Sequence, residues 1–305
     1  MTACVVGVDG GGSTTRARVS GLDGATLGEG SASGSNWESV GVERAVDAVG
    51  AAVRAALAAA GRGAADVVAS AFGLAGVDWP SDASMLDDAL AALGLGGVRW
   101  VDNDVMVALR ATCGTRAGVV SNVGTGAVTA GRGAGGATLR SMAVGWGEPS
   151  GASGLVRDAL HAVAAAHHGT APWTVLTEAV LAASGAPDVA SLFERVSRQR
   201  LRPTAAWAPL VTRAASEGDD VARRLLAASG ERHGAMVVGI ATKLGIVHDD
   251  VPVAMSGSVH HAGDAWFAPA FAATVAAGCP RATLSLAEEP PVHGAVLIAL
   301  DLIGA

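Results

Sequence analysis

The residues best suited to chemistry lie near the start of the chain, where the apolar run at 5–8 ends in a carboxylate, three glycines and three hydroxyls. Glycine has no Cβ, so a turn built from it can bring backbone N–H groups close to an anionic oxygen. The hydroxyls at 13–15 can add donors, and Asp9 can hold a water molecule of a Mg²⁺ ion that accompanies phosphates. The predicted phosphate-binding residues are Gly10, Gly11, Gly12, Ser13 and Thr14.

The residues after the glycines decide what kind of turn this is. Residues 15–20 alternate in polarity, 21–24 form a turn, and a second short strand begins at Ala25, which predicts a hairpin. A dinucleotide-binding fold or a P-loop requires a helix here, and the only lysine, Lys243, is far from any P-loop pattern. The alternative is a glycine-rich hairpin that binds no ligand.

A second stretch, residues 118–131, repeats this pattern. A strand leads into the turn Gly124, Thr125, Gly126, a second strand follows, and 137–140 can form a third. Two such turns, each followed by strands and then helices, indicate an internally duplicated α/β architecture with a cleft between the halves. We predict domains at 1–114 and 115–305, each with a sheet that begins as an antiparallel meander, and a last helix that can return to the first domain.

Two polar segments are candidates for binding a sugar hydroxyl. Asn36 can donate to and accept from vicinal hydroxyls while the ring of Trp37 covers the apolar side of a sugar, or Asn36 or Ser39 simply caps the next helix. Asp104 follows the predicted strand 98–102, where open α/β sheets place their chemistry, and is the candidate general base. The alternative is that Asp102 or Asn103 is simply the N-cap of the next helix, and that the negative charge of Asp104 interacts with the dipole at the N-terminus of that helix.

Other segments predict structure that frames these candidates. An apolar stripe over 42–57 predicts a helix that ends near Gly61, and Ser81 is predicted to cap a short helix. The chain is predicted to be mainly helical from 154 to about 226. The segment 249–259 predicts a strand and a small-residue turn, Gly257 and Ser258, against which a flat base can lie.

Composition limits the remaining possibilities. Of the 305 residues half are apolar and 16% are charged, so a large core can form, and the net charge of −7 includes no basic patch for nucleic acid. No apolar run is long enough to cross a membrane and no leader precedes the first strand, so we expect a cytoplasmic protein without a membrane partner. The histidine pairs 167–168 and 260–261 are expected at the surface or in caps. The isolated cysteines, expected to be small buried hydrophobes, are Cys4, Cys113 and Cys279.

Together these stretches resemble the N-acetylglucosamine kinases and the wider BadF/BadG/BcrA/BcrD ATPase family of the sugar-kinase and actin superfamily. The resemblance runs nearly end to end, through 7–14, 103–104, 122–127 and 256–259. It implies two actin-like, ribonuclease-H-like domains with a nucleotide cleft, ATP and Mg²⁺ as cofactors, a small-molecule sugar substrate and a homodimer. It also implies adenosine contacts at Gly257 and Ser258. The sugar contacts that it implies are Asn36, Trp37, Asp104, Gly145 and Trp146. Glu148 is a further candidate sugar contact.

The sequence departs from this family after Gly147, where an Asp-Glu pair that usually precedes the next Ser-Gly segment is missing. The Asp of that pair binds sugar hydroxyls in the family, and Glu148 is close enough in sequence to replace it. Loss of such an acceptor weakens discrimination between substrates. We therefore predict an ATP-dependent kinase acting on N-acetylglucosamine, glucosamine or a related amino sugar. The alternatives are a non-catalytic sugar or nucleotide sensor and a BadF-type ATPase with another acceptor.

Overall fold

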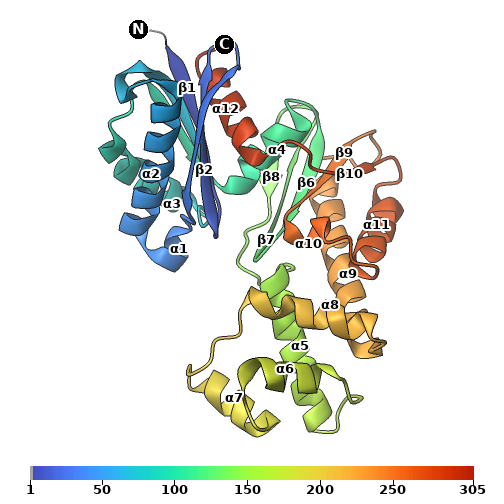
Figure 1. Ribbon diagram of the computed structural model, residues 1–305. Helices are drawn as coiled ribbons and strands as arrows, with labels where there is room; N and C mark the ends of the chain where they lie inside the picture. Colours follow the sequence, from blue (N-terminus) through green and yellow to red (C-terminus); the bar gives the residue numbers. More distant parts are fainter. Residues whose placement is uncertain (1–2) are drawn as a thin grey trace. The chain divides into compact units, whose positions relative to one another are not determined.

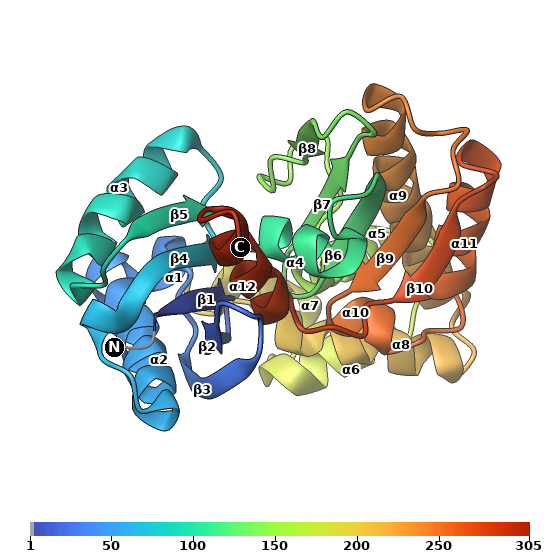
Figure 2. The same ribbon diagram turned by 90° about the horizontal axis from the view of Figure 1, so that it is seen from above.

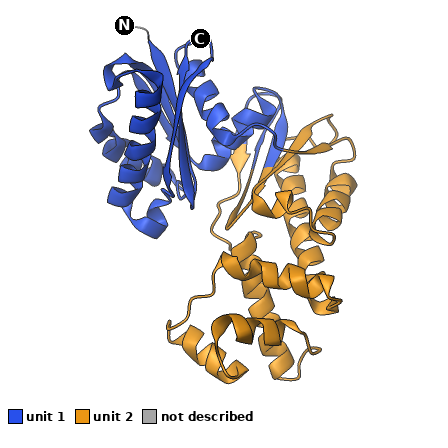
Figure 3. Cartoon of the chain, viewed as in Figure 1, with its two compact units in different colours: residues 1–120, 130–138, 287–305 blue, residues 121–129, 139–286 orange. Residues whose placement is uncertain are grey.

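The computed structural model describes residues 3–305 and divides into two compact units (Figure 3). Unit 1 comprises residues 1–120, 130–138 and 287–305, and unit 2 comprises 121–129 and 139–286. Each unit is described by itself below. The domain boundary after residue 114 stays a prediction.

The first sheet has five strands in the order β3-β2-β1-β4-β5 (β1 and β2 are labelled in Figure 1, all five strands in Figure 2). Its strands are β1 (Cys4–Gly10), β2 (Thr14–Gly21), β3 (Thr26–Ser33), β4 (Val67–Leu74) and β5 (Val98–Asp102). The pairs β1–β2 and β2–β3 are antiparallel, whereas β4 lies parallel to both β1 and β5. The hairpin and the meander predicted for this half are therefore confirmed.

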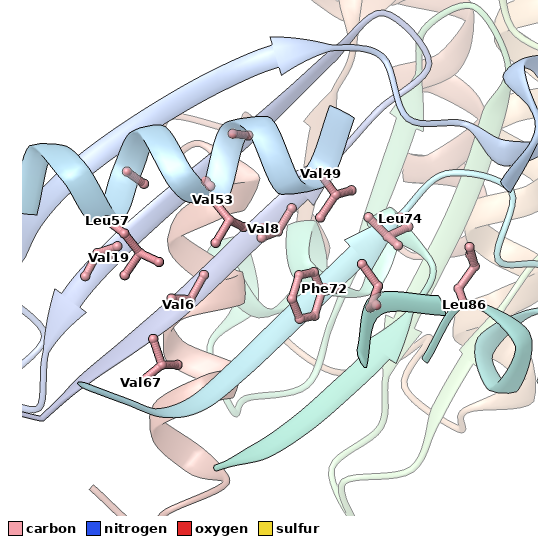
Figure 4. Packing of buried hydrophobic residues seen from close by; sticks show 14 of the residues in the cluster. Val6, Val8, Val19, Val49, Val53, Leu57, Val67, Phe72, Leu74 and Leu86 are labelled. Atoms are coloured by element: carbon pink, nitrogen blue, oxygen red, sulfur yellow. The ribbon is translucent and has the colours of Figure 1, made fainter. Parts of the chain in front are cut away.

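Alternating residues of β1 pack on opposite faces of this sheet, as the two-residue period of a strand requires. Val6 and Val8 belong to the cluster formed with α2 (Val42–Ala60) and α3 (Pro80–Leu90) (Figure 4). Val5 belongs instead to the cluster with α12 (Pro291–Asp301). The first sheet is thus covered by helices on both faces, which fixes the end of β1 where the glycine turn begins.

The helices of unit 1 begin and end largely where the sequence predicts. α2 ends at Gly61, whose φ of 62° is left-handed. The cap predicted at Ser81 is wrong, because α3 begins one residue earlier with Pro80 in its first turn, and the carboxylate of Asp82 accepts from the backbone N–H of Trp79. The other helical segments are α1 (Trp37–Val40), η1 (Ala64–Asp66), η2 (Ala91–Leu93) and α4 (Asp104–Cys113).

The second sheet has the order β10-β9-β6-β7-β8 (Figure 2). Its strands are β6 (Gly118–Val123), β7 (Ala127–Arg132), β8 (Thr138–Arg140), β9 (Pro252–Ser256) and β10 (Thr283–Leu286). Written in the opposite direction, this order is β8-β7-β6-β9-β10, which matches the order β3-β2-β1-β4-β5 of the first sheet. In both sheets the first strand has the next two strands on one side and the last two on the other. The duplication expected from the two glycine turns is present in the strand order.

A helical region lies between β8 and β9. Its helices are α5 (Ala152–His167), α6 (Leu176–Ser184), α7 (Val189–Ser197), η3 (Ala205–Trp207), α8 (Ala208–Ser216) and α9 (Asp220–Lys243). Their buried leucines, valines and alanines form a separate core. The helical region continues beyond residue 226, because α9 ends at Lys243. Two further helices, α10 (Ser258–His261) and α11 (Phe267–Gly278), follow β9.

The three cysteines are buried free thiols, as expected from their isolation. Of the histidine pairs, His167 and His168 are exposed, whereas His260 is only 5% exposed, so the surface role expected for it is wrong. Within residues 3–305 no helix is both long and apolar enough to cross a membrane.

Candidate functional site

The first glycine turn joins β1 to β2 and is held from two sides. Within it, the N–H of Gly11 donates to the carbonyl of Thr14 at 3.0 Å. On one side the N–H of Ser35, just after β3, donates to the carbonyl of Gly11 at 3.0 Å. On the other side the N–H of Ala75, just after β4, donates to the carbonyl of Gly10 at 2.7 Å. Neighbouring strand ends therefore fix the shape of the turn.

The free side of this turn is open. Apart from the two neighbours of Gly12 in sequence, no atom of residues 3–305 lies within 4 Å of the position that a Cβ on Gly12 would take, and Ser13 and Thr14 are exposed. Thr15 is different, because its buried hydroxyl donates to the carbonyl of Ser33 at 2.7 Å and contacts the hydroxyl of Ser35 at 2.9 Å. Thr15 therefore holds the turn together and does not serve as the third phosphate donor that the sequence suggested.

Asp9 has the environment of a carboxylate that a cation would stabilise. Burial raises its pKa to about 6, and the neighbouring Arg16 on β2 only partly offsets this effect. Mg²⁺ commonly keeps several waters and binds through one or two carboxylates together with phosphate oxygens, so one buried carboxylate beside the open turn fits the ion. No cluster of three or more His, Cys, Asp or Glu residues that could hold a metal ion occurs in the described part of the chain.

Asp9→Asn is expected to stabilise the metal-free protein above pH 6. The folded state holds the Asp9 proton up to about pH 6, against 3.8 for the ordinary carboxyl, so the free energy of unfolding falls as pH rises between these values. The neutral amide avoids this loss, which is on the order of 3 kcal/mol. Urea denaturation in EDTA should show the variant more stable at pH 8 and equal to the wild type near pH 4. Equal stability at pH 8, with the exposed Asp88→Asn as control, contradicts the prediction.

The other candidate residues of unit 1 gather at the carboxyl edge of the same sheet. Gly73 on β4 pairs with Asp9 on one side and with Asp102 on the other. Strands are spaced by about 4.8 Å, so Asp9 and Asp102 are separated by about 10 Å across the sheet. Asp104, two residues beyond Asp102, therefore lies at the edge that carries the first glycine turn. That edge is where the sequence placed the general base.

Asn103 organises the segment beside Asp104. It is the N-cap of α4, since its side-chain oxygen accepts from the N–H of Val105 at 3.0 Å. Its amide group donates to the carbonyl of Val77 at 3.2 Å and to a carboxylate oxygen of Asp78 at 3.0 Å. The capping alternative is confirmed for Asn103. Asp104 is the first residue of α4, and its role as a general base stays a prediction.

Asn36 and Trp37 are fixed against the segment that follows β4. The side-chain oxygen of Asn36 accepts from the N–H of Glu38 at 3.0 Å, so Asn36 does cap a helix. The indole N–H of Trp37 donates to the carbonyl of Gly76 at 2.6 Å. A Cβ on Gly76 would lie 2.8 Å from the Asn36 oxygen, so glycine permits this close packing. The sugar contacts predicted for this pair would come from the Asn36 amide and the Trp37 ring face.

The second glycine turn is closed by the start of α5. The N–H groups of Ala152 and Ser153 donate to the carbonyls of Gly124 at 2.8 Å and Thr125 at 3.0 Å. Gly151 must be glycine, because a Cβ there would lie 2.1 Å from the carbonyl oxygen of Gly126. The Cβ positions of Gly124 and Gly126 themselves are open. Both turns therefore leave one side free for an anion.

The predicted adenosine segment meets this second turn. Gly257 follows β9 with a φ of 89°, and a Cβ on it would lie 2.4 Å from the carbonyl oxygen of Val123. Unit 2 thus brings together the end of β6, the Gly124–Gly126 turn, and the start of α10, where Ser258 lies. The contacts of these residues with a nucleotide stay a prediction.

The loop after β8 contains the remaining sugar candidates. Trp146 is 86% exposed, and Gly145 and Gly147 flank it with φ of 72° and 69°. Glu148 turns back on its own loop, where one carboxylate oxygen accepts from the N–H of Met142 at 2.6 Å. Its other oxygen is buried and has no hydrogen-bond partner within residues 3–305. Replacement of the missing acidic pair by Glu148 stays a prediction. The oxygen without a partner is the atom that would accept a hydrogen bond from a sugar hydroxyl.

Sequence reasoning missed the small residues that close the two turns. A Cβ on Gly34 would lie 2.2 Å from the carbonyl of Gly12, just as Gly151 touches Gly126. Gly34 directly follows β3, Gly151 follows β8 after a longer loop, and each lies just before a helix. A comparison of the two halves of the sequence at the glycine before the first helix that follows the third strand could have identified them.

Part of this chain is similar in sequence to a curated kinase. Over 150 residues the chain is 33% identical to the N-acetylmuramic acid/N-acetylglucosamine kinase of Clostridium acetobutylicum, an alignment of 49% of this chain and 48% of that protein. The chain thus spans about half the length of this curated relative.

Solved structures match over a longer range. A candidate N-acetylglucosamine kinase from Chromobacterium violaceum has a TM-score of 0.75 at 26% identity, with 98% of this chain and 99% of that chain covered. The ROK family glucokinase of Streptomyces griseus, solved with glucose and AMPPNP, shares the fold, with a TM-score of 0.58 at 18% identity and coverage of 98% and 99%. The two five-stranded α/β sheets are thus those of the sugar-kinase and actin-like fold.

A family model covers almost the whole sequence. It matches residues 6–299, which include both glycine turns, the Asn103–Asp104 segment and the turn after β9. The chain belongs to the BadF/BadG/BcrA/BcrD ATPase family.

Proposed function

We propose that this protein is an ATP-dependent kinase that phosphorylates a hydroxyl group of an amino sugar. The observation that carries the proposal is the repeated glycine turn: each is closed on one side by a small-residue segment and open on the other. In unit 1 this turn shares a sheet edge with Asp104. Family membership and the kinase names of the relatives support the use of ATP.

In the proposed reaction the residues of this chain position the reactants and move one proton. Asp104 accepts the proton of the sugar hydroxyl while the oxygen of that hydroxyl bonds to the γ-phosphorus of ATP. The bond between the γ-phosphorus and the oxygen that bridges it to the β-phosphate breaks, and ADP leaves. The backbone and hydroxyls of the two glycine turns bind phosphate oxygens. Mg²⁺, bound to Asp9 through water, would neutralise phosphate charge. Gly257 and Ser258 form the platform for the adenosine.

The acceptor is proposed to be an amino sugar because the Clostridium acetobutylicum relative is named for N-acetylmuramic acid and N-acetylglucosamine. Asn36, Trp37, Gly145, Trp146 and Glu148 are proposed, like Asp104, to contact the sugar. One hydrogen bond to a charged group contributes about 1.5–3 kcal/mol, so the missing acidic pair should raise KM about 10- to 100-fold for a sugar that depended on it. We therefore expect weak or broad activity on N-acetylglucosamine and better turnover of glucosamine, N-acetylmuramic acid or another amino sugar.

A coupled assay of ADP release over a panel of amino sugars and neutral sugars tests this function. We expect sugar-dependent ADP release, with the highest kcat/KM on an amino sugar. Glu148→Gln should raise KM for that sugar about 10-fold through loss of its charge, while KM for ATP stays unchanged. Glu178→Gln, an exposed change on α6, is the matched control.

One observation favours a second candidate function. Glu148 bonds to its own loop and the usual acidic pair is missing, which is how a sugar site without catalysis would look. ATP binding without ADP release on any sugar would establish a sensor and refute the kinase. Selective N-acetylglucosamine turnover that Glu148→Gln leaves unchanged would show that the deletion does not matter.

A further inference from the structure

Four buried aromatic rings form a cluster in unit 2. His233 comes from α9, His260 from α10, and Phe267 and Phe271 from α11. The His260 ring centroid lies 5.4 Å from that of Phe267 and 4.8 Å from that of Phe271, and His233 lies 5.7 Å from Phe267. His233 has 0% exposure. The two imidazoles are therefore fixed by packing inside the unit.

Close packing of α9 against α11 fixes the position of these rings along the two helices. Gly230 and Gly234 flank His233 on α9, and a Cβ on Gly230 would lie 2.3 Å from the carbonyl oxygen of Phe267. A Cβ on Gly234 would lie 2.7 Å from the Cβ of Thr274. Because both contacts involve atoms that cannot move without displacing α11, the imidazoles have little freedom to shift along the helices.

His260 bonds to the strand that leads into the second glycine turn. Its Nε2 lies 3.1 Å from the hydroxyl oxygen of Ser121, a fully buried residue of β6 three positions before Gly124. Gly257, at the start of the same short helix, packs on the carbonyl of Val123. The segment after β9 thus holds the end of β6 at two points.

His233 bonds to the segment that closes the turn. Its Nε2 lies 3.3 Å from the carbonyl oxygen of Ser150. A carbonyl only accepts, so Nε2 carries the proton and Nδ1 does not. Nδ1 is buried and has no hydrogen-bond partner in the described part of the chain. Ser150 directly precedes Gly151, which touches the turn at Gly126.

Burial keeps both rings neutral at physiological pH. It lowers the pKa of His233 to about 4 and that of His260 to about 3. A neutral imidazole has one donor and one acceptor nitrogen, so the bond to Ser150 fixes a single tautomer of His233. His233 therefore donates from Nε2 to the Ser150 carbonyl, whereas the hydroxyl of Ser121 can either donate to or accept from His260.

We propose that His233 and His260 are positioning residues that hold the Gly124–Gly126 turn in its phosphate-binding form. His233 acts through Ser150 and the start of α5, and His260 acts through Ser121 and β6. The inference rests on the proposed function, because it takes the turn to bind the phosphates of ATP. It predicts that both histidines affect nucleotide binding although neither belongs to a nucleotide motif.

The decisive comparison is His233→Phe against His233→Gln. Phenylalanine keeps an aromatic ring beside Phe267 but leaves the Ser150 carbonyl without its donor, whereas the glutamine amide can still donate to it. We expect His233→Phe to raise KM for ATP about 10-fold, with kcat and KM for the sugar changed less than about twofold. His233→Gln should restore KM for ATP to within about threefold of the wild type. His161→Gln, an exposed change on α5 itself, is the control.

Ser121→Ala tests the contact of His260 with the same measurements and should raise KM for ATP about threefold. It also carries the test if His233→Phe does not fold. An unchanged KM for ATP in a folded variant, or equal losses in His233→Phe and His233→Gln, overturns the inference.

Calorimetric titration of the full chain with AMPPNP separates this inference from the proposed function. Binding to the wild type that weakens about 10-fold in His233→Phe supports both. Binding that is equal in the wild type and the folded variants overturns only the positioning role. Absence of binding to the wild type contradicts the proposed function, and the positioning role falls with it.

Discussion

Asp104→Asn is expected to lower kcat by about 10²- to 10⁴-fold while the affinity for ATP stays unchanged, because asparagine cannot accept the proton of the attacking hydroxyl. The substitution keeps the size of the side chain at the first position of α4. Asn103, which caps this helix, is left intact, so the local fold should survive. Initial rates of ADP release at saturating sugar and ATP measure kcat, and calorimetry with AMPPNP measures nucleotide affinity.

The matched control for this experiment is Asp88→Asn on α3, an exposed change of the same kind in the same unit, which should leave kcat within about twofold because it removes no buried contact. Asp104→Glu keeps the carboxylate but moves it by one methylene, so an intermediate loss is expected. A rate for Asp104→Asn within about threefold of the wild type would remove Asp104 from proton transfer, because general bases contribute more than that.

Gly151→Ala is expected to raise KM for ATP about 10- to 100-fold, since relief of a buried steric clash costs about 1–3 kcal/mol. The added Cβ would lie 2.1 Å from the Gly126 carbonyl oxygen and 2.3 Å from that of Gly124. Both are backbone atoms, so either the turn or the start of α5 must move. The bonds from Ala152 and Ser153 to the turn would then lengthen or break. Steady-state kinetics with varied ATP and AMPPNP calorimetry measure the effect.

Gly239→Ala provides the control for the glycine substitution. Gly239 is exposed within α9, and apart from its sequence neighbours and the backbone of its own helix no described atom lies within 4 Å of its Cβ position. Alanine in a helix interior is favoured over glycine by about 1 kcal/mol, so this variant should be slightly more stable with unchanged KM for ATP. A thermal melt of Gly151→Ala identifies any loss that comes from unfolding. A folded Gly151→Ala protein with wild-type nucleotide affinity would show that the second turn does not bind phosphate.

Local pattern was enough to predict the elements that carry the candidate site. Alternation after the first glycines predicted the β1–β2 hairpin, because strand periodicity and turn residues are properties of neighbouring positions. The repeat of this pattern near residue 124 predicted a duplicated architecture, and both sheets have the same strand order. The start of α3 is also a local feature, because proline is common in the first turn of a helix and Pro80 is the first residue of α3.

Roles that depend on distant partners could not be predicted in this way. The hydroxyl of Thr15 was named as one that can donate to phosphate, yet it donates to the carbonyl of Ser33 at the end of β3 and contacts the hydroxyl of Ser35. His260 was expected at the surface or in a cap, yet it packs against Phe267 and Phe271 and contacts Ser121 across 139 positions of sequence. Sequence spacing does not report which hydrogen-bond partner a folded chain brings within reach.

By itself the sequence determined the family, the α/β class, the two glycine turns and the position of Asp104 at a strand end, because motif spacing and periodicity are encoded locally. Only the tertiary structure decided how the turns are closed. Gly34 and Gly151 touch turns that lie 22 and 25 residues earlier, at Gly12 and Gly126. The raised pKa of Asp9 is likewise a property of the tertiary structure, because the desolvation of a carboxylate depends on the helices that cover its sheet.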